Sequence, residues 1–202
     1  MDNLGTMATT STEYKTKKQL ICEAAARLFR DKGYSATSMR DLAETVQLKA
    51  SSLYNHIGSK EEILREICFT NARRFHIGMK EVEQLPHATA SDKVRALIRL
   101  HIRIATEDFT SVTAFNDEWR HLSEPYLTEF KTLRKDYENR FLSIIEYGIQ
   151  NGEFKPLDAF TTLYTLFSSV RWLYDWYKPE RQVTPEALYE QIAAFLMSGL
   201  ER

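Results

Sequence analysis

Residues 37–60 of this chain read TSMRDLAETVQLKASSLYNHIGSK. In the first half, apolar side chains recur at helical spacing behind Ser38, and Asp41 follows three residues later, an arrangement typical of a capped helix start. A second short helical pattern begins near Lys49 or Ala50. Two helices this short cannot bury a core alone. We therefore expect them to pack on another part of the chain.

The exposed side of the second short helix carries no acidic residue. It offers small hydroxyl side chains first and then a phenol, an amide and an imidazole. Such a surface can approach another molecule closely and form many hydrogen bonds, which suits the groove of a nucleic acid. The residues of this surface are Lys49, Ser51, Ser52, Tyr54, Asn55 and His56.

A longer helix is predicted ahead of this pair, from Glu13 to Gly33. Three lysines, Lys15, Lys17 and Lys18, crowd its start. Cations at a helix N-terminus oppose the helix dipole, so they do not serve helix stability. Contact with phosphate groups would explain them, and a merely solvated basic end is the alternative.

Several motifs over residues 24–64 carry a resemblance to a known family. They are AAARLF at 24–29, Gly33-Tyr34, Thr37, RDLA at 40–43, LYNH at 53–56, SKE at 59–61 and Leu64. Together they resemble the N-terminal domain of the TetR family of bacterial repressors, a helix-turn-helix seated on a first helix. The resemblance implies a homodimer whose second helices enter successive major grooves of a two-fold symmetric, double-stranded DNA operator.

The same resemblance assigns roles to single residues. It implies phosphate contacts for Thr37, Ser38, Tyr54 and Lys60, and base-edge contacts for Lys49, Ala50, Ser51, Ser52, Asn55 and His56. Lys17 and Lys18 are added to the phosphate contacts on the charge argument given above. The chemistry agrees, because an asparagine can pair with adenine and small side chains can meet a thymine methyl. For Tyr54 and His56, packing against the first helix is the alternative.

Four positions depart from what the family commonly has. Gln47 stands where glycine is usual, Lys49 replaces serine, Ser51 replaces glycine and Ile57 replaces phenylalanine. These departures leave the fold as expected. They leave open how tight the turn is and which operator sequence is read.

Composition predicts a folded protein with its positive charge at one end. The 202 residues are 43% hydrophobic and 12% aromatic, enough for a packed core. Residues 1–60 carry a formal charge of +3 and the remainder −4, which suits a protein that presents one end to a polyanion. Only two cysteines occur, so a disulfide scaffold or a four-ligand zinc site is not expected. No stretch predicts a membrane span or a signal sequence, and we expect a cytoplasmic protein without a membrane partner.

The chain is expected to be all-α in three parts. We predict a disordered tail at 1–12, a three-helix, helix-turn-helix DNA-binding domain at 13–60, and a helical effector-binding and dimerisation domain at 61–202. The latter begins with a long helix capped by Ser59. Further helices are predicted at about 90–108, 111–121, 124–151, 158–178 and 185–200. The last two are rich in apolar residues and are predicted to form half of a four-helix dimer interface.

Aromatic and polar residues concentrated in the C-terminal part predict a pocket for a small, largely apolar effector. The predicted lining is His101, Phe115, Asn116, Trp119, Arg120, Tyr137, Phe167, Arg171 and Tyr174. A satisfied core histidine is the alternative for His101. Residues 171–179 also look like the end of a TetR subgroup that contains acyl-CoA-responsive regulators. In that case Arg73, Arg74, Arg134 and Arg171 would bind phosphates, unless they form surface ion pairs.

The leading hypothesis is a repressor that a small effector releases from its operator. The alternative is an effector-independent DNA-binding protein controlled by a protein partner. Metal binding by Asp117, Glu118 and His121 is only weakly indicated, and no cofactor is expected. An all-helical hydrolase using His101 or His121 is disfavoured, because no nucleophile with a spaced base is evident. We expect no catalytic residues.

Overall fold

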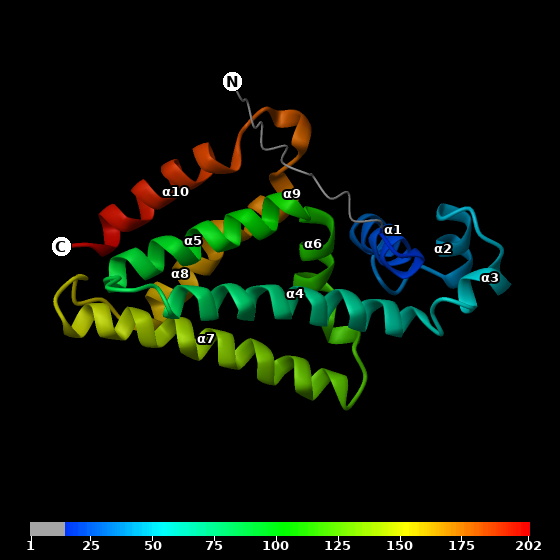
Figure 1. Ribbon diagram of the computed structural model, residues 1–202, viewed down its shortest axis with the longest axis horizontal. Helices are drawn as coiled ribbons and strands as arrows, with labels where there is room; N and C mark the ends of the chain where they lie inside the picture. Colours follow the sequence, from blue (N-terminus) through cyan, green and yellow to red (C-terminus); the bar gives the residue numbers. More distant parts are fainter. Residues whose placement is uncertain (1–14) are drawn as a thin grey trace, which may run out of the picture.

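A computed structural model describes residues 15–202, and helices account for nearly all of its regular structure (Figure 1). This confirms the all-α expectation. The predicted tail at 1–12 and the predicted helix start at Glu13 lie outside the described residues. Among the helices described, none is long and apolar enough to cross a membrane.

Three helices form the N-terminal unit: α1 (Lys17–Lys32), α2 (Met39–Thr45) and α3 (Ala50–Tyr54). The α2 start is capped as predicted, because the Ser38 hydroxyl accepts a hydrogen bond from the Asp41 N–H and the Asp41 carboxylate accepts one from the Ser38 N–H. Between α2 and α3, Gln47 takes a φ of 54°. The left-handed conformation that favours glycine is therefore kept at the position where glycine is usual in the family.

The helix α4 (Lys60–Glu83) leaves this unit and runs through the whole helical body (Figure 1). Ser59 caps it, with Glu61 and Glu62 in the first turn. It packs on α1 at one end and on the helices of the body along its length. A single rigid element thus joins the two parts of the molecule.

The body is built from helices that pack along α4 and bury a continuous apolar core. Its elements are α5 (Ala90–Glu107), α6 (Phe109–Asp117), the 3₁₀ turn η1 (Trp119–His121), α7 (Tyr126–Gln150), α8 (Ala159–Arg171), α9 (Leu173–Trp176), the 3₁₀ turn η2 (Pro179–Arg181) and α10 (Pro185–Leu200). The helix predicted at 111–121 starts earlier and ends in η1. Helix α6 also packs against α1, so it joins body and N-terminal unit a second time.

The prediction of one continuous helix at 158–178 is wrong. The helix is interrupted at Trp172, which separates α8 from α9. At this point the Trp172 indole N–H donates to the Ser169 carbonyl at 2.8 Å, which is the acceptor that an unbroken helix would reserve for the Leu173 N–H. The side chain thus competes with the helical ladder, a local effect that apolar periodicity does not report.

The last helix, α10, packs on α5. The Arg99 guanidinium lies 3.7 Å from the centre of the Tyr189 ring, and Arg95 pairs with Glu201 at 2.8 Å. The opposite side of α10 leaves Phe195 80% exposed, and α8 leaves Phe160 55% exposed. Both predicted interface helices therefore carry large apolar side chains that remain more than half exposed in residues 15–202.

Candidate nucleic-acid interface and body cavity

The side chains expected to form a DNA-facing surface on α3 are largely exposed. Leu53 and Ile57 are buried and anchor it to the N-terminal unit, while Ser52 is half-buried. The side chains of Lys49, Ala50, Ser51, Tyr54, Asn55 and His56 are exposed. Tyr54 is 52% exposed and His56 is exposed, so neither side chain is buried against α1, the alternative for both.

Asn55 and His56 lie just beyond α3 and not within it. The N–H groups of His56 and Ile57 both donate to the Leu53 carbonyl, at 3.0 and 3.1 Å. This tightens the end of the helix into a turn. The two side chains still project on the exposed side, next to Tyr54.

The assignment of Thr37 as a phosphate contact is wrong. Its side chain is 1% exposed, and its hydroxyl donates to the Gly33 carbonyl at 2.9 Å. Gly33 has a φ of 86°, a conformation that favours glycine at this corner. Thr37 therefore closes the corner between α1 and α2, and the exposed residue at that point is Ser38.

Lys60 is half-buried and its amino group is already partly occupied. It donates to the carbonyls of Tyr34 at 2.8 Å and Thr37 at 2.7 Å, and it lies 4.4 Å from the centre of the Tyr34 ring. Two of the three ammonium donors are thus used within the protein, which leaves one for a phosphate. In this structure Lys60 ties the start of α4 to the corner at 33–37.

The N-terminal lysines differ from one another. Lys18 pairs with Glu62 at 3.4 Å and Glu66 at 3.1 Å, and the Glu66 hydrogen bond raises the pKa of the Lys18 ammonium. Lys15 pairs with Glu23 at 2.7 Å. Lys17 is exposed and forms no ion pair in the part of the chain that the structure describes. Of the three, it is the cation most available to a phosphate.

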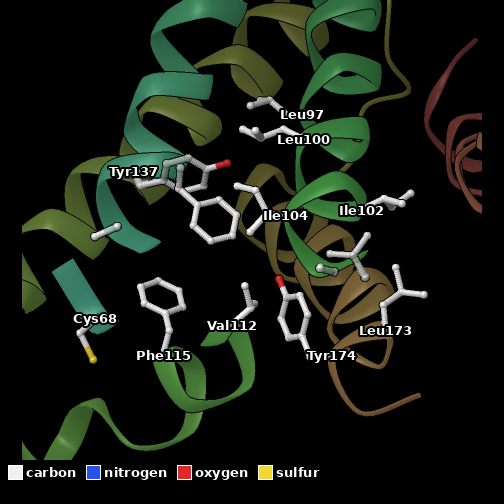
Figure 2. Close-up of a cluster of buried hydrophobic side chains, with 14 of the residues drawn as sticks. Cys68, Leu97, Leu100, Ile102, Ile104, Val112, Phe115, Tyr137, Leu173 and Tyr174 are labelled. Atoms are coloured by element: carbon white, nitrogen blue, oxygen red, sulfur yellow. The ribbon is translucent and has the colours of Figure 1, made fainter. Parts of the chain in front are cut away.

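A cavity of about 240 Å³ lies in the body between α4, α5, α6, α7, α8 and α9. Most of its wall is aromatic or aliphatic. Figure 2 shows part of the neighbouring apolar core. Phe115, Tyr137 and Tyr174 reach into this core from three different helices. The predicted residues that line the cavity are His101, Phe115, Asn116, Tyr137, Phe167, Arg171 and Tyr174.

His101 forms the polar centre of the inner wall. It is 7% exposed, and its Nε2 lies 2.9 Å from the Tyr137 hydroxyl. The centres of the Phe75 and Phe167 rings lie 4.9 and 5.5 Å from the imidazole. Burial lowers the pKa of His101 to about 4 and raises that of Tyr137, so both are neutral at pH 7. The His101 Nδ1 has no hydrogen-bond partner within the described chain, so His101 is only half satisfied.

Two arginines supply the positive charge of the cavity wall. Arg171 pairs with Asp117. Arg134 is half-buried, and burial lowers its pKa, while the charge of Glu138, which also lines the cavity, acts in the opposite direction. Among residues 15–202 Arg134 forms no ion pair. Its guanidinium lies 5.1 Å from the centre of the Trp119 ring. A half-buried guanidinium without a carboxylate partner is a ready receptor for an anion.

Trp119 and Arg120 do not line the cavity, so this part of the prediction is wrong. The Trp119 ring is contacted by the Arg120 and Arg134 guanidinium groups at 4.7 and 5.1 Å and by Phe130 at 5.8 Å. Trp119 therefore supports Arg134 from behind. Arg120 is exposed.

Two family models match the chain. One, described as "Bacterial regulatory proteins, tetR family", matches residues 21–67, and one described as "Tetracyclin repressor-like, C-terminal domain" matches residues 87–200, more than half of the chain. The chain belongs to the TetR family. It is accordingly a helix-turn-helix, DNA-binding transcriptional regulator and not an enzyme.

Relatives within the TetR family align over nearly the whole chain. The transcriptional repressor KstR2 of Mycolicibacterium smegmatis is 25% identical, with 95% of this chain and 94% of KstR2 covered. AibR, solved in complex with isovaleryl coenzyme A and operator DNA, is 25% identical with a TM-score of 0.77 and covers 89% of this chain and 97% of its own. The ketosteroid regulator KstR2 of Mycobacterium tuberculosis has a TM-score of 0.87 at 22% identity, covering 94% and 97%, which shows the shared fold.

Several cavity residues of this TetR protein escape the sequence analysis. They come mainly from α4, α7 and α8, and they are Ala72, Phe75, His76, Leu133, Arg134, Glu138, Tyr164 and Ser168. The apolar members lie on the apolar stripes of their helices, and such a stripe does not separate cavity from core. The polar members have no sequence signal that places them in the pocket, although Arg134 is among the arginines expected to bind phosphate.

The other arginines considered as phosphate ligands lie outside the cavity wall. Arg74 pairs with Glu107 at 2.7 Å, and Arg73 lies 3.7 Å from Glu66. The weak metal indication also finds no support, because no group of three metal-ligating side chains forms within residues 15–202.

Proposed function

We propose that this TetR-family protein is a dimeric repressor that an anionic, largely apolar small molecule releases from its operator. The proposal rests on the cavity, where aromatic walls surround a half-buried and unpaired Arg134. Burying an unpaired cation is costly, so a group of opposite charge is the natural occupant. The acid-free α3 surface is the part that would read the operator.

The chemistry of the wall narrows the effector class. The apolar part of the ligand would contact Phe75, Phe115 and Phe167, and its carboxylate or phosphate would contact Arg134 and Arg171. The unpaired His101 Nδ1 offers one further hydrogen bond to a neutral polar group. The complex of AibR with isovaleryl coenzyme A supports a CoA thioester as the first class to test.

Cavity size sets how such a thioester would bind. Ligand pockets commonly enclose about 300–1,000 Å³, and this cavity of about 240 Å³ is smaller. It would hold the acyl group, and the nucleotide end would extend beyond Arg134 and Arg171. A small free acid would fit entirely.

The dimer is proposed to form through α8 and α10. Phe195 is 80% exposed, Phe160 55% and Trp172 43%, and a second copy would remove these apolar surfaces from water. The dimer would place two α3 helices about one turn of DNA apart, as two-fold symmetric half-sites require. A cavity ligand that favours another spacing would lower operator affinity by its differential affinity for the two states.

A thermal-shift panel of CoA thioesters, the corresponding free acids and neutral esters tests the proposal. We expect the anionic compounds to raise the melting temperature and the neutral esters to do so less. The compounds that stabilise the protein should then release it from an operator selected from random DNA. Stabilisation by neutral esters alone would contradict the role of the arginines.

The alternative is a DNA-binding protein without a small effector, controlled by a protein partner. The cavity argues against it, because a body without a ligand would be expected to fill this space with side chains. If the selected operator binds tightly and no compound of the panel alters binding or melting, this alternative replaces the effector hypothesis.

A further inference from the structure

The connection between α6 and α7 is bound to the N-terminal unit and to the first turn of α4 by two crossed hydrogen bonds. The Tyr34 N–H donates to the Glu118 carboxylate at 3.0 Å, and the Ser123 N–H donates to the Glu61 carboxylate at 2.9 Å. Glu118 belongs to the body and Glu61 to the first turn of α4. Each side thus supplies one carboxylate and one backbone N–H. We call this pair of hydrogen bonds the clasp.

The clasp holds the corner that sets the position of α2. Tyr34 follows Gly33, and its ring stacks on His121 with ring centres 5.0 Å apart. His121 Nε2 also lies 3.3 Å from the Glu118 carboxylate. On the side of the N-terminal unit, Lys60 holds the Tyr34 carbonyl. Tyr34 is therefore fixed between the body and the start of α4, three residues before the Thr37 that closes the corner.

The same few residues form part of the cavity wall. Phe115 and Asn116 line the cavity, and Asp117 pairs with Arg171, which also lines it. Glu118 is the next residue along the chain. A change in the wall at Asp117 is thus one residue away from the contact with Tyr34.

We propose that Glu118 is the positioning residue through which occupancy of the cavity reaches the DNA-reading unit. This rests on the proposed function, because it needs an anion in the cavity. The anion competes with Asp117 for Arg171, the end of α6 moves, and the hydrogen bond between Glu118 and Tyr34 breaks. The corner at 33–37 is then released from the body.

The exposure of the two contacts supports this order of events. The side chains of Arg171 and Asp117 are 56% and 43% exposed, and ion pairs so exposed are weak and easily exchanged. The Glu118 side chain is 17% exposed, and a more buried carboxylate bound to a backbone N–H is held more strongly. The weak, exchangeable ion pair between Asp117 and Arg171 is therefore adjacent in the chain to the stronger hydrogen bond between Glu118 and Tyr34.

The test uses 8-anilino-1-naphthalenesulfonate, which has an aromatic body and a single anionic group. Its binding to the full chain is measured by fluorescence, and amide hydrogen exchange at Tyr34 is measured with and without it. The variants are E118A, the conservative E118Q, whose amide oxygen still accepts a hydrogen bond, and D117N. Glu146 is exposed on α7 and forms no ion pair within residues 15–202, so E146A is the matched control.

In the wild type and in E146A, we expect the probe to speed exchange at Tyr34 by about tenfold, the scale set by breaking one charge-assisted hydrogen bond. In E118A, exchange should be fast without the probe and change less than about twofold on its addition, although the probe still binds. E118Q should behave as the wild type. D117N keeps the clasp but lacks the exchangeable pair, so its response should be small.

Two results would overturn the inference. One is a bound probe that leaves Tyr34 exchange unchanged in the wild type, and the other is a full response in both E118A and D117N. Failure of the probe to bind the wild type is a different outcome, because it removes the anion-accepting cavity of the proposed function and with it the input to Glu118. If E118A does not fold, D117N and E118Q still decide the question.

Discussion

The α3 surface and the body cavity differ in the hydration of their polar groups. Lys49, Ser51 and Asn55 are exposed, and their polar groups are in contact with water. In the cavity, burial keeps His101 neutral, and the half-buried Arg134 forms no ion pair within residues 15–202. The first region suits a partner that brings charge and water with it, and the second suits a ligand that brings an apolar body and one anion. A substitution on α3 should therefore weaken DNA binding without affecting ligand binding, and a substitution in the cavity should do the reverse.

The largest effect is expected from Leu53→Ala, which removes a fully buried anchor of α3. A core truncation of this kind costs about 2–5 kcal/mol, and the small N-terminal unit has little core to spare. Operator binding should be abolished, while the body still binds a cavity ligand. Denaturant unfolding and ligand binding measured on the same sample check this, with Leu85→Ala, at 41% exposure, as the control. If Leu53→Ala lost ligand binding together with DNA binding, the two regions would not be independent.

A pH effect is expected from His101. Its folded pKa of about 4 lies below the usual 6.5, so the unfolded chain binds more protons between these values. The stability is fully present near pH 7 and falls as the pH drops from 6.5 to 4, by about 3 kcal/mol. Unfolding free energies at pH 7 and 4.5 should differ less in His101→Gln than in the wild type. The exposed His87 provides the control variant H87Q, and equal pH dependence in all three proteins would rule out His101 as the source.

Arg134→Ala should separate the two regions most cleanly. Removing a charge-assisted hydrogen bond is expected to weaken an anionic cavity ligand by about tenfold or more. Operator affinity without ligand should remain within about twofold. Calorimetric titration of the ligand and anisotropy titration of the operator measure the two quantities. An Arg134→Ala protein that binds the ligand as the wild type does would remove the basis for an anionic effector.

The smallest effects are expected among the lysines of the N-terminal unit. Each phosphate that a lysine no longer neutralises lowers the slope of log affinity against log salt by about 1. Lys17→Ala should lower the slope by about 2 in the dimer, because each subunit loses one phosphate contact. Lys18→Ala should leave it unchanged, because Lys18 is paired with Glu62 and Glu66. Titrations at several salt concentrations check it. Equal slopes for the two variants would mean that the ion pairs of Lys18 do not persist on DNA.

The sequence predicted what depends on neighbours along the chain. The Ser38 cap with Asp41 and the inward placement of Leu53 and Ile57 follow from local spacing, and the structure confirms them. The burial of Thr37 did not follow, because it depends on the Gly33 carbonyl across the corner.

The cavity was predicted only in part, because its wall comes from six helices. The lining role of His101 and Tyr137 could be inferred from their stripes, and their hydrogen bond could not. Trp119 was assigned to the wall because of its size and polarity. The position of Phe130 and Arg134 against its ring depends on how α7 crosses the end of α6, and no spacing within either helix specifies that.

Occupancy of the cavity is proposed to control the α3 surface. Anisotropy titration of the selected operator, with and without a saturating compound that stabilises the protein, measures this coupling. The operator Kd should rise by about 5–150-fold with the compound, the usual range of coupling between two sites. A compound that binds in the cavity and leaves the operator Kd unchanged would contradict it.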